Sequence, residues 1–159
     1  MTRFFKEATA TIPIVAVSGD PIAFGLATSL ARPDGNITGV VVDAGKDIEG
    51  KRIELLKEMV PGASRLAYIT PRAMWESPFG AQARDAAQRA GVSLFAIPLE
   101  TPIQEAEPEY RHAFAAAAAG DVAGLIMPDI EKHITYRRLI LKLAKEARMP
   151  TIHSYRHFC

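Results

Sequence analysis

The sequence has little cysteine, little net charge and no long apolar run, and each shortage excludes a class of protein. The single cysteine among 159 residues is Cys159, which excludes an internal disulfide framework and a zinc site built on cysteines. Basic residues number 19 against 18 acidic ones, so the formal charge of +1 provides no broad field for nucleic acid. The longest uniform run, 115–119, is far shorter than the roughly 18 apolar residues of a membrane-spanning helix.

The signatures of export, metal binding and catalysis are also missing. Residues 1–7 mix charges with two phenylalanines and precede no small-residue cleavage site, so we expect no export signal in this chain. The four histidines lack HxxxH or HExxH spacing, and His153 and His157, four apart, follow a segment predicted to be a strand. No GxGxxG, Walker or GxSxG motif occurs. We therefore expect no metal, no cofactor and no enzymatic activity.

Short apolar runs alternate with longer amphipathic segments from residue 48 onward. The 48% hydrophobic and 23% charged composition is that of a soluble globular chain, and the length suits one compact domain or one lobe of a larger protein. The pattern predicts helices over 48–60, 77–90, 108–119 and 131–148, and strands over 65–70, 92–97, 122–127 and 150–153. Such alternation is typical of an α/β fold with a doubly wound parallel sheet and helices on both faces.

The first 42 residues predict a smaller group of elements. The run 11–17 predicts a strand, 22–30 a helix that ends at Arg32-Pro33-Asp34-Gly35, and 37–42 a second strand. A lone strand and helix cannot bury a parallel strand on both faces. The segment therefore needs a partner surface, supplied either by further chain or by a second copy.

Several of these segments together resemble a known family. The stretches TIPIV (11–15), GDP (19–21), ATSLARPDGNITGV (27–40) and GKRIELLKEMVPG (50–62) resemble the ABC-transporter substrate-binding proteins of the tryptophan/tyrosine type. These are periplasmic-binding-protein-like proteins with two Rossmann-like lobes. The resemblance continues to the PTIHS and YRHF segments at 150–158, and its SLARP and GNITG part is the most specific.

The resemblance implies a periplasmic, non-enzymatic binding protein. It implies an amino acid or similar small molecule held between two lobes, and an ABC permease as partner. Members of the family carry an export signal and further βα units before the first strand here, and more chain after Phe158, so the chain looks truncated at both ends. We accordingly expect residues 1–36 to be a remnant of the first lobe, 37–46 a hinge or crossover, and 47–159 the second lobe with four βα-type units.

Candidate binding residues follow from the geometry of parallel sheets, where ligands bind beyond the carboxyl ends of the strands. The candidates in loops at such ends, and in the segment after the last strand, are Gly19, Asp20, Thr70, Trp75, Ser77, Asp129 and Ser154. The resemblance adds that the loop containing Asp20 lies at the ligand cleft.

Each candidate has a structural alternative. Asp20 suits a ligand ammonium group, with Gly19 allowing a close backbone approach, but an Asp before Pro21 equally suits a helix cap. Asp129 is likewise a candidate cap, and Ser77 a candidate N-cap. Trp75, the only tryptophan, suits stacking on a flat ligand or packing on the sheet edge.

Two other functions remain open from the residues. One is a non-catalytic interaction module, a truncated gene product that acts as a homodimer through residues 12–30. The other, less favoured, is a flavodoxin-like enzyme that uses Asp20 or Asp129 as a base.

Overall fold

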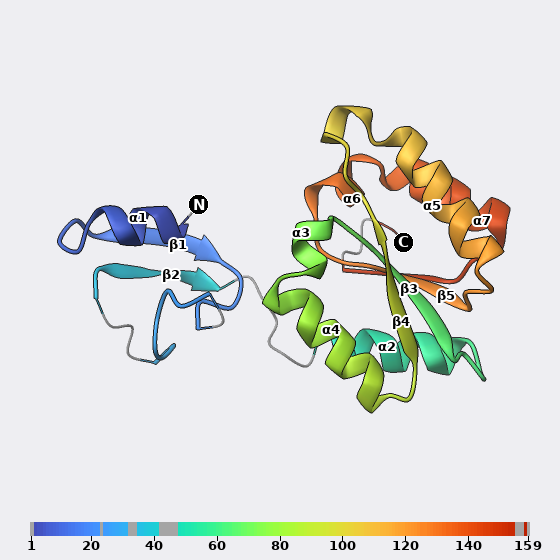
Figure 1. The fold of residues 1–159 in the computed structure, drawn as a ribbon, viewed down its shortest axis with the longest axis horizontal. Helices are drawn as coiled ribbons and strands as arrows, with labels where there is room; N and C mark the ends of the chain where they lie inside the picture. The colour runs from blue at the N-terminus through green and yellow to red at the C-terminus, as the bar shows by residue number, and fades with distance from the viewer. Residues whose placement is uncertain (1, 23, 32–34, 42–47, 155–157, 159) are drawn as a thin grey trace. The chain divides into compact units, whose positions relative to one another are not determined.

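The chain forms two compact units. The computed structural model describes residues 2–22, 24–31, 35–41, 48–154 and 158. Its contacts divide the chain into an N-terminal unit, Met1–Ile48, and a C-terminal unit, Glu49–Cys159. Strands alternate with helical segments in the C-terminal unit, whereas one helix and then two strands form the N-terminal unit (Figure 1).

A four-stranded parallel sheet forms the centre of the C-terminal unit (Figure 1). Its strands are β3 (Arg65–Thr70), β4 (Ser93–Pro98), β5 (Gly124–Met127) and β6 (Thr151–His153). The order across the sheet is β4-β3-β5-β6, and every neighbouring pair is parallel. The predicted α/β fold with a parallel sheet is confirmed, and β3 is an interior strand as expected.

Helices cover both faces of this sheet. Residues of α2 (Ile48–Met59) and α4 (Pro78–Arg89) pack on one core, and those of α5 (Glu107–Ala119) and α7 (Arg137–Ala147) on another. Strand β3 is buried on both sides because Leu66 and Tyr68 join the first core whereas Ala67 and Ile69 join the second. This alternation explains why the strand reads as a continuous apolar run.

The ends of α4 follow from its sequence. The hydroxyl of Ser77 accepts a hydrogen bond from the N–H of Phe79 at 3.2 Å, so the predicted N-cap is confirmed. Gly91 follows the helix with a φ of +67°, a left-handed conformation that favours glycine. Within the helix, a Cβ on Gly80 would lie 1.9 Å from the carbonyl oxygen of Trp75, so only glycine permits this approach.

The predicted helix 131–148 is wrong as a single element. It is divided into α6 (Glu131–Thr135) and α7 by Tyr136, whose φ of −94° and ψ of 15° interrupt the helical path. The ring of Tyr136 lies 5.3 Å from that of Tyr110, so the break accompanies an aromatic contact between α5 and this segment. Two short elements not expected from the sequence are α3 (Arg72–Trp75) and the 3-10 helix η1 (Ile103–Glu105). The apolar spacing of 48–60 also predicts that Met59 faces inward, and this is wrong because its side chain is exposed.

The N-terminal unit holds a two-stranded parallel sheet. Strand β1 (Ile14–Ser18) pairs with β2 (Ile37–Val41), and an unexpected helix, α1 (Thr2–Ala8), precedes them. A Cβ on Gly39 would lie 1.7 Å from the carbonyl oxygen of Ala16, so the two strands approach where β2 has no side chain. The hinge expected at 37–46 stays a prediction, because its first five residues form β2 and the rest lie outside the described residues.

The predicted helix 22–30 is wrong. Its described residues form turns and bends. Gly25 has a φ of +65°, which takes the chain out of a right-handed helix, and Pro21 accepts the N–H of Leu26 at 2.7 Å. The apolar spacing in this segment therefore reflects turn chemistry and not a helix face.

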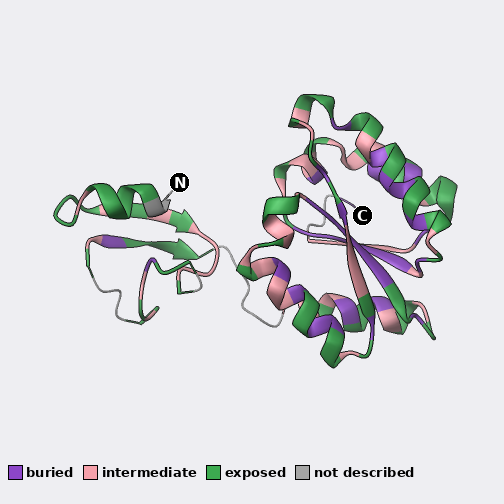
Figure 2. Cartoon of the chain, viewed as in Figure 1, coloured by how far each residue is buried: buried purple, intermediate pink, exposed green. Residues whose placement is uncertain are grey.

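Burial differs sharply between the units (Figure 2). The two interior strands of the C-terminal sheet, β3 and β5, are largely buried, whereas both strands of the N-terminal sheet are coloured mostly as exposed or intermediate. On one face of the N-terminal sheet, Val15, Val17 and Val40 are 80%, 71% and 64% exposed. We call these three residues the valine face.

Candidate functional site

The predicted residues of the C-terminal unit gather around one edge of its sheet. Thr70 is the last residue of β3, Asp129 lies two residues after β5, and Ser154 directly follows β6. The strands are parallel and in register, with Met127 opposite His153, so these three positions share the carboxyl edge. The strand order reverses between β3 and β5, and a ligand in an open α/β sheet binds beside such a reversal.

Thr70 is the most deeply buried of the candidates. Its residue exposure is 0%, and no described group forms a hydrogen bond with its hydroxyl oxygen. A buried polar atom without a partner costs roughly 1–3 kcal/mol, so native structures contain few of them. The Nδ1 atom of His153, on β6, is likewise buried and has no hydrogen-bond partner among the described residues.

Trp75 packs against protein groups. Its ring centroid lies 5.9 Å from that of Tyr68, and the guanidinium of Arg84 lies 4.7 Å above its ring. The ring is half-buried against the core shared by α2 and α4. The packing alternative therefore describes this residue in the structure.

The remaining candidates of this unit have local partners. The hydroxyl of Ser77, besides capping α4, donates to the carbonyl of Met74 at 2.6 Å. Ile130 occupies the N-cap position of α6, so Asp129 is not the N-cap residue of this helix. The hydroxyl of Ser154 lies 3.5 Å from the carbonyl oxygen of Met127, a weak hydrogen bond.

Gly19 and Asp20 lie in the N-terminal unit, directly after β1. A carboxylate oxygen of Asp20 accepts the N–H of Ile22 at 2.9 Å, so the side chain closes a turn and not the helix that the sequence predicts. The hydroxyl of Ser18 donates to the carbonyl of Gly19 at 3.2 Å. In the same unit, a cavity of about 190 Å³ opens between the β1–β2 sheet and the segment 21–30.

Two polar residues of the C-terminal unit, one buried and one half-buried, were not predicted from the sequence. His133 of α6 is 2% exposed, and its Nε2 lies 3.0 Å from the carbonyl oxygen of Ile69. Because a carbonyl only accepts, Nε2 carries the proton, and Nδ1 of the neutral ring accepts from the hydroxyl of Tyr110 at 2.7 Å. Burial lowers the pKa of His133 to about 3, and the Ile69 carbonyl opposes that shift only in part.

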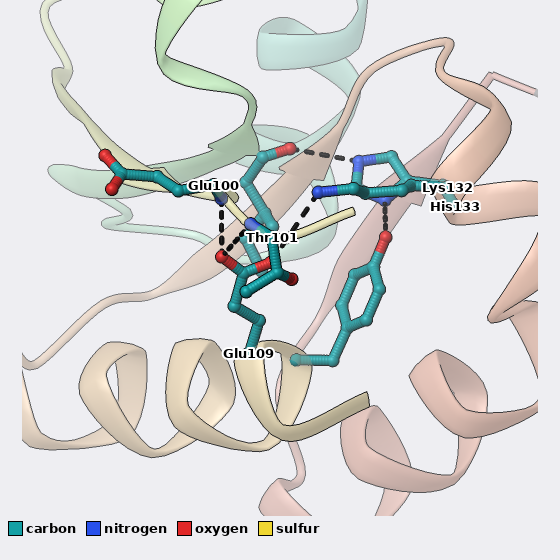
Figure 3. A network of polar contacts seen from close by, with 7 residues as sticks. Glu100, Thr101, Glu109, Lys132 and His133 are labelled. Carbon is teal, nitrogen blue, oxygen red and sulfur yellow. Dashed lines mark hydrogen bonds and ion pairs between the residues drawn. The ribbon is translucent and has the colours of Figure 1, made fainter. Parts of the chain in front are cut away.

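Glu109 is the other unpredicted residue, and it forms the centre of a polar network (Figure 3). One carboxylate oxygen accepts the backbone N–H groups of Glu100 and Thr101, the latter at 2.9 Å. The other oxygen accepts the Thr101 hydroxyl at 2.7 Å and lies 3.6 Å from Nζ of Lys132. Burial alone would raise the pKa of Glu109, but these hydrogen bonds and the Lys132 charge lower it below its usual range.

Two further ion pairs are found in this unit. One lies beyond the carboxyl ends of β3 and β4, and the other lies at the start of α2. Arg72, two residues after β3, pairs with Glu100 at 2.6 Å, and both side chains are more than half exposed. Arg52 pairs with Glu49 in the first turns of α2, where both side chains are largely buried. Burial raises the pKa of Tyr68, and the neighbouring Glu49 carboxylate raises it further.

Neither a metal centre nor a membrane-crossing helix is found in the part of the chain that the structure describes. No cluster of three or more potential metal-ligating residues occurs among these residues, and His157, named above, lies outside them. No described helix combines the length and apolar character needed to cross a bilayer.

Comparison with known proteins decides the family. A family model for ABC transporter substrate binding proteins matches residues 2–158. The chain belongs to this family. It matches none of the curated proteins.

The fold of these substrate-binding proteins is also found in solved structures. The ABC domain from Streptococcus pneumonia, solved in complex with L-Trp, is 17% identical over 96% of this chain, with a TM-score of 0.73. A conserved domain protein from Vibrio cholerae O1 biovar El Tor is 18% identical over 97% of the chain, with a TM-score of 0.74. A ligand-free, open substrate-binding protein with adhesive properties from Clostridium difficile is 24% identical over 93%, with a TM-score of 0.60. The chain spans 50%, 50% and 48% of these three structures, about half their length.

Proposed function

We propose that the chain acts as the substrate-binding component of an ABC transporter and binds an amino acid or similar small molecule. The observation that carries this proposal is the family match over residues 2–158. Relatives of this kind present their cargo to a permease, so we place the protein in the periplasm with an ABC permease as partner. The L-Trp complex of the Streptococcus protein supports an amino acid as the first ligand to test.

The geometry supports the carboxyl edge of the C-terminal sheet as one wall of the site. Thr70 ends β3 beside the reversal of strand order, and its buried hydroxyl has no partner among the described groups. A ligand carboxylate or carbonyl would accept a hydrogen bond from this hydroxyl, and an ammonium group would donate one.

A thermal-shift screen of the full chain tests the proposal. The probes are L-tryptophan, L-tyrosine, the other amino acids and nucleosides, and we expect at least one amino acid to raise the melting temperature. Absence of any shift across the panel contradicts the proposed ligand class.

The substitution Thr70→Val tests whether the carboxyl edge of the C-terminal sheet contacts the ligand. Because it removes an unpartnered buried hydroxyl at nearly constant shape, the free protein should gain stability, whereas the shift caused by the ligand should shrink. Thr135→Val, at the exposed end of α6, is the matched control and should leave both unchanged. An undiminished ligand shift in the Thr70 variant excludes Thr70 from the site.

We also propose a homodimer through residues 12–30, because this segment exposes large apolar side chains. Ile12 and Leu30 are 64% and 61% exposed, in addition to Val15 and Val17 of the valine face. At about 25 cal/mol per Å² of apolar surface, their burial by a second copy would contribute several kcal/mol. We expect an interface above roughly 1,200 Å² in total.

Light scattering at micromolar concentration tests the dimer. We expect twice the mass of one chain, and the substitution Val17→Lys should shift the protein toward the monomer because it places a charge on the valine face. A monomer in the unsubstituted protein contradicts the proposal.

A further inference from the structure

Two consecutive residues of α5 contact two consecutive residues of α6. Glu109 lies 3.6 Å from Nζ of Lys132, and the hydroxyl of Tyr110 lies 2.7 Å from Nδ1 of His133 (Figure 3). The two contacts are therefore made by the first turns of the same pair of helices. A displacement of α6 along α5 breaks both at once.

Glu109 and His133 each form further hydrogen bonds with residues at the carboxyl edge of the sheet. Glu109 accepts the backbone N–H groups of Glu100 and Thr101, which follow β4. His133 donates from Nε2 to the carbonyl of Ile69, the next-to-last residue of β3. The network thus joins the ends of β3 and β4 to helices α5 and α6, and α6 itself follows β5.

The central ion pair is more protected from water than the other pairs on this helix. The side chains of Lys132 and Glu109 are 13% and 18% exposed, whereas those of Arg111 and Glu107, also on α5, are 51% and 54% exposed. An exposed pair contributes little because water and salt screen it, and a protected pair with additional hydrogen bonds contributes more. The same helix therefore supplies a matched control.

We propose that Glu109 and His133 are positioning residues that hold the loops after β4 and β5 on the end of β3 as one rigid edge. This inference rests on the proposed binding function, since the edge is the wall against which the ligand would pack. A preformed wall loses less conformational entropy on binding than loops that have to be ordered, so it binds more tightly.

Amide hydrogen exchange on the full chain tests the positioning directly, without any ligand. In Glu109→Ala we expect exchange at Glu100 and Thr101, and at the amides of α6, to rise by about tenfold or more, since the shared acceptor of both N–H groups and the partner of Lys132 are lost. Glu107→Ala removes the exposed pair and should change neither region.

A conservative variant separates positioning from general stability. Both backbone N–H groups bind the same carboxylate oxygen, so Glu109→Gln retains their acceptor while losing the charge beside Lys132. We expect it to restore slow exchange at Glu100 and Thr101 but not at α6. Lys132→Gln should accelerate α6 alone, and it serves as well if Glu109→Ala fails to fold.

The outcomes distinguish this inference from the proposed function. Unchanged exchange in α6 of Glu109→Ala or Lys132→Gln, or equal effects of the Glu109 and Glu107 variants, overturns the positioning role. With L-tryptophan as probe, we expect Glu109→Ala to weaken binding about tenfold and Glu107→Ala to leave it unchanged. If the native chain does not bind L-tryptophan, that ligand is wrong and the exchange results alone decide the positioning role.

Discussion

The two units of the chain contain the same type of sheet but bury it to different extents. In the C-terminal unit, helices cover both faces of four parallel strands, and β3 is buried from Leu66 to Thr70. In the N-terminal unit, two parallel strands leave the valine face open among the described residues. Parallel strands depend on cover from both sides, so secondary structure alone does not make the N-terminal unit self-sufficient.

The largest expected difference is in the protection of the two sheets against amide exchange. In dilute monomer, the amides of β3 and β5 should exchange at least about a thousandfold more slowly than those of β1 and β2, because only the former lie in a closed core. Hydrogen exchange followed by mass spectrometry measures this ratio. If the two sheets were equally protected at every protein concentration, the proposed difference between the units would be wrong. Protection of β1 that rises with protein concentration would indicate association.

Truncation of one apolar side chain in each unit sharpens the comparison. Leu56 of α2 is 0% exposed, so Leu56→Ala should lower the free energy of unfolding by about 2–5 kcal/mol. Val15 is 80% exposed, and Val15→Ala should change it by less than about 0.5 kcal/mol in the monomer. Urea titrations followed by circular dichroism give both values, and equal losses would mean that Val15 is covered in solution.

Acid should weaken the C-terminal unit through its buried histidine. The pKa of His133 is about 3 in the folded chain and about 6.5 when unfolded, so below pH 6.5 the unfolded chain binds more protons. Stability contributed by the neutral ring is therefore present above pH 6.5 and is lost as the pH falls toward 3. Between pH 7 and pH 5 the loss should be about 2 kcal/mol.

The substitution His133→Gln provides the control for this acid effect. It removes the titrating ring, so the difference in unfolding free energy between pH 7 and pH 5 should shrink. Part of the difference should persist, because burial also lowers the pKa of His153, to about 4. An unchanged pH dependence in the variant would show that His133 is not the responsible group.

Local chemistry made much of the C-terminal fold predictable. The bounds of β3 and the N-cap at Ser77 depend on neighbouring residues, and the sequence displays both. The helix predicted at 22–30 failed because its apolar spacing matches a helix whereas Gly25 adopts a left-handed turn. The break at Tyr136 accompanies a contact with Tyr110, 26 residues earlier, and a contact between such distant residues cannot be read from the local sequence.

The candidate site was predictable in place but not in composition. Thr70, at the end of a strand, follows from the rule that ligands bind at carboxyl ends. Glu109 and Lys132 lie 23 positions apart, and each looks like an ordinary charge on a helix surface. His133 looks like a lone histidine between Lys132 and Ile134, and only the tertiary fold reveals that it is buried. Such pairs would become visible through covariation among related sequences.

The single tryptophan gives the molecule an optical property that differs between its units. Trp75 and all four tyrosines follow residue 48, whereas the aromatic residues of the N-terminal unit are all phenylalanines. Emission excited at the red edge of the ultraviolet absorption therefore reports the state of the C-terminal unit alone, with Arg84 over the indole as a nearby charge. Loss of order around β1 and β2 is silent in such a spectrum. Phe4→Trp, at a side chain 76% exposed, would add a second chromophore that makes the silent unit visible.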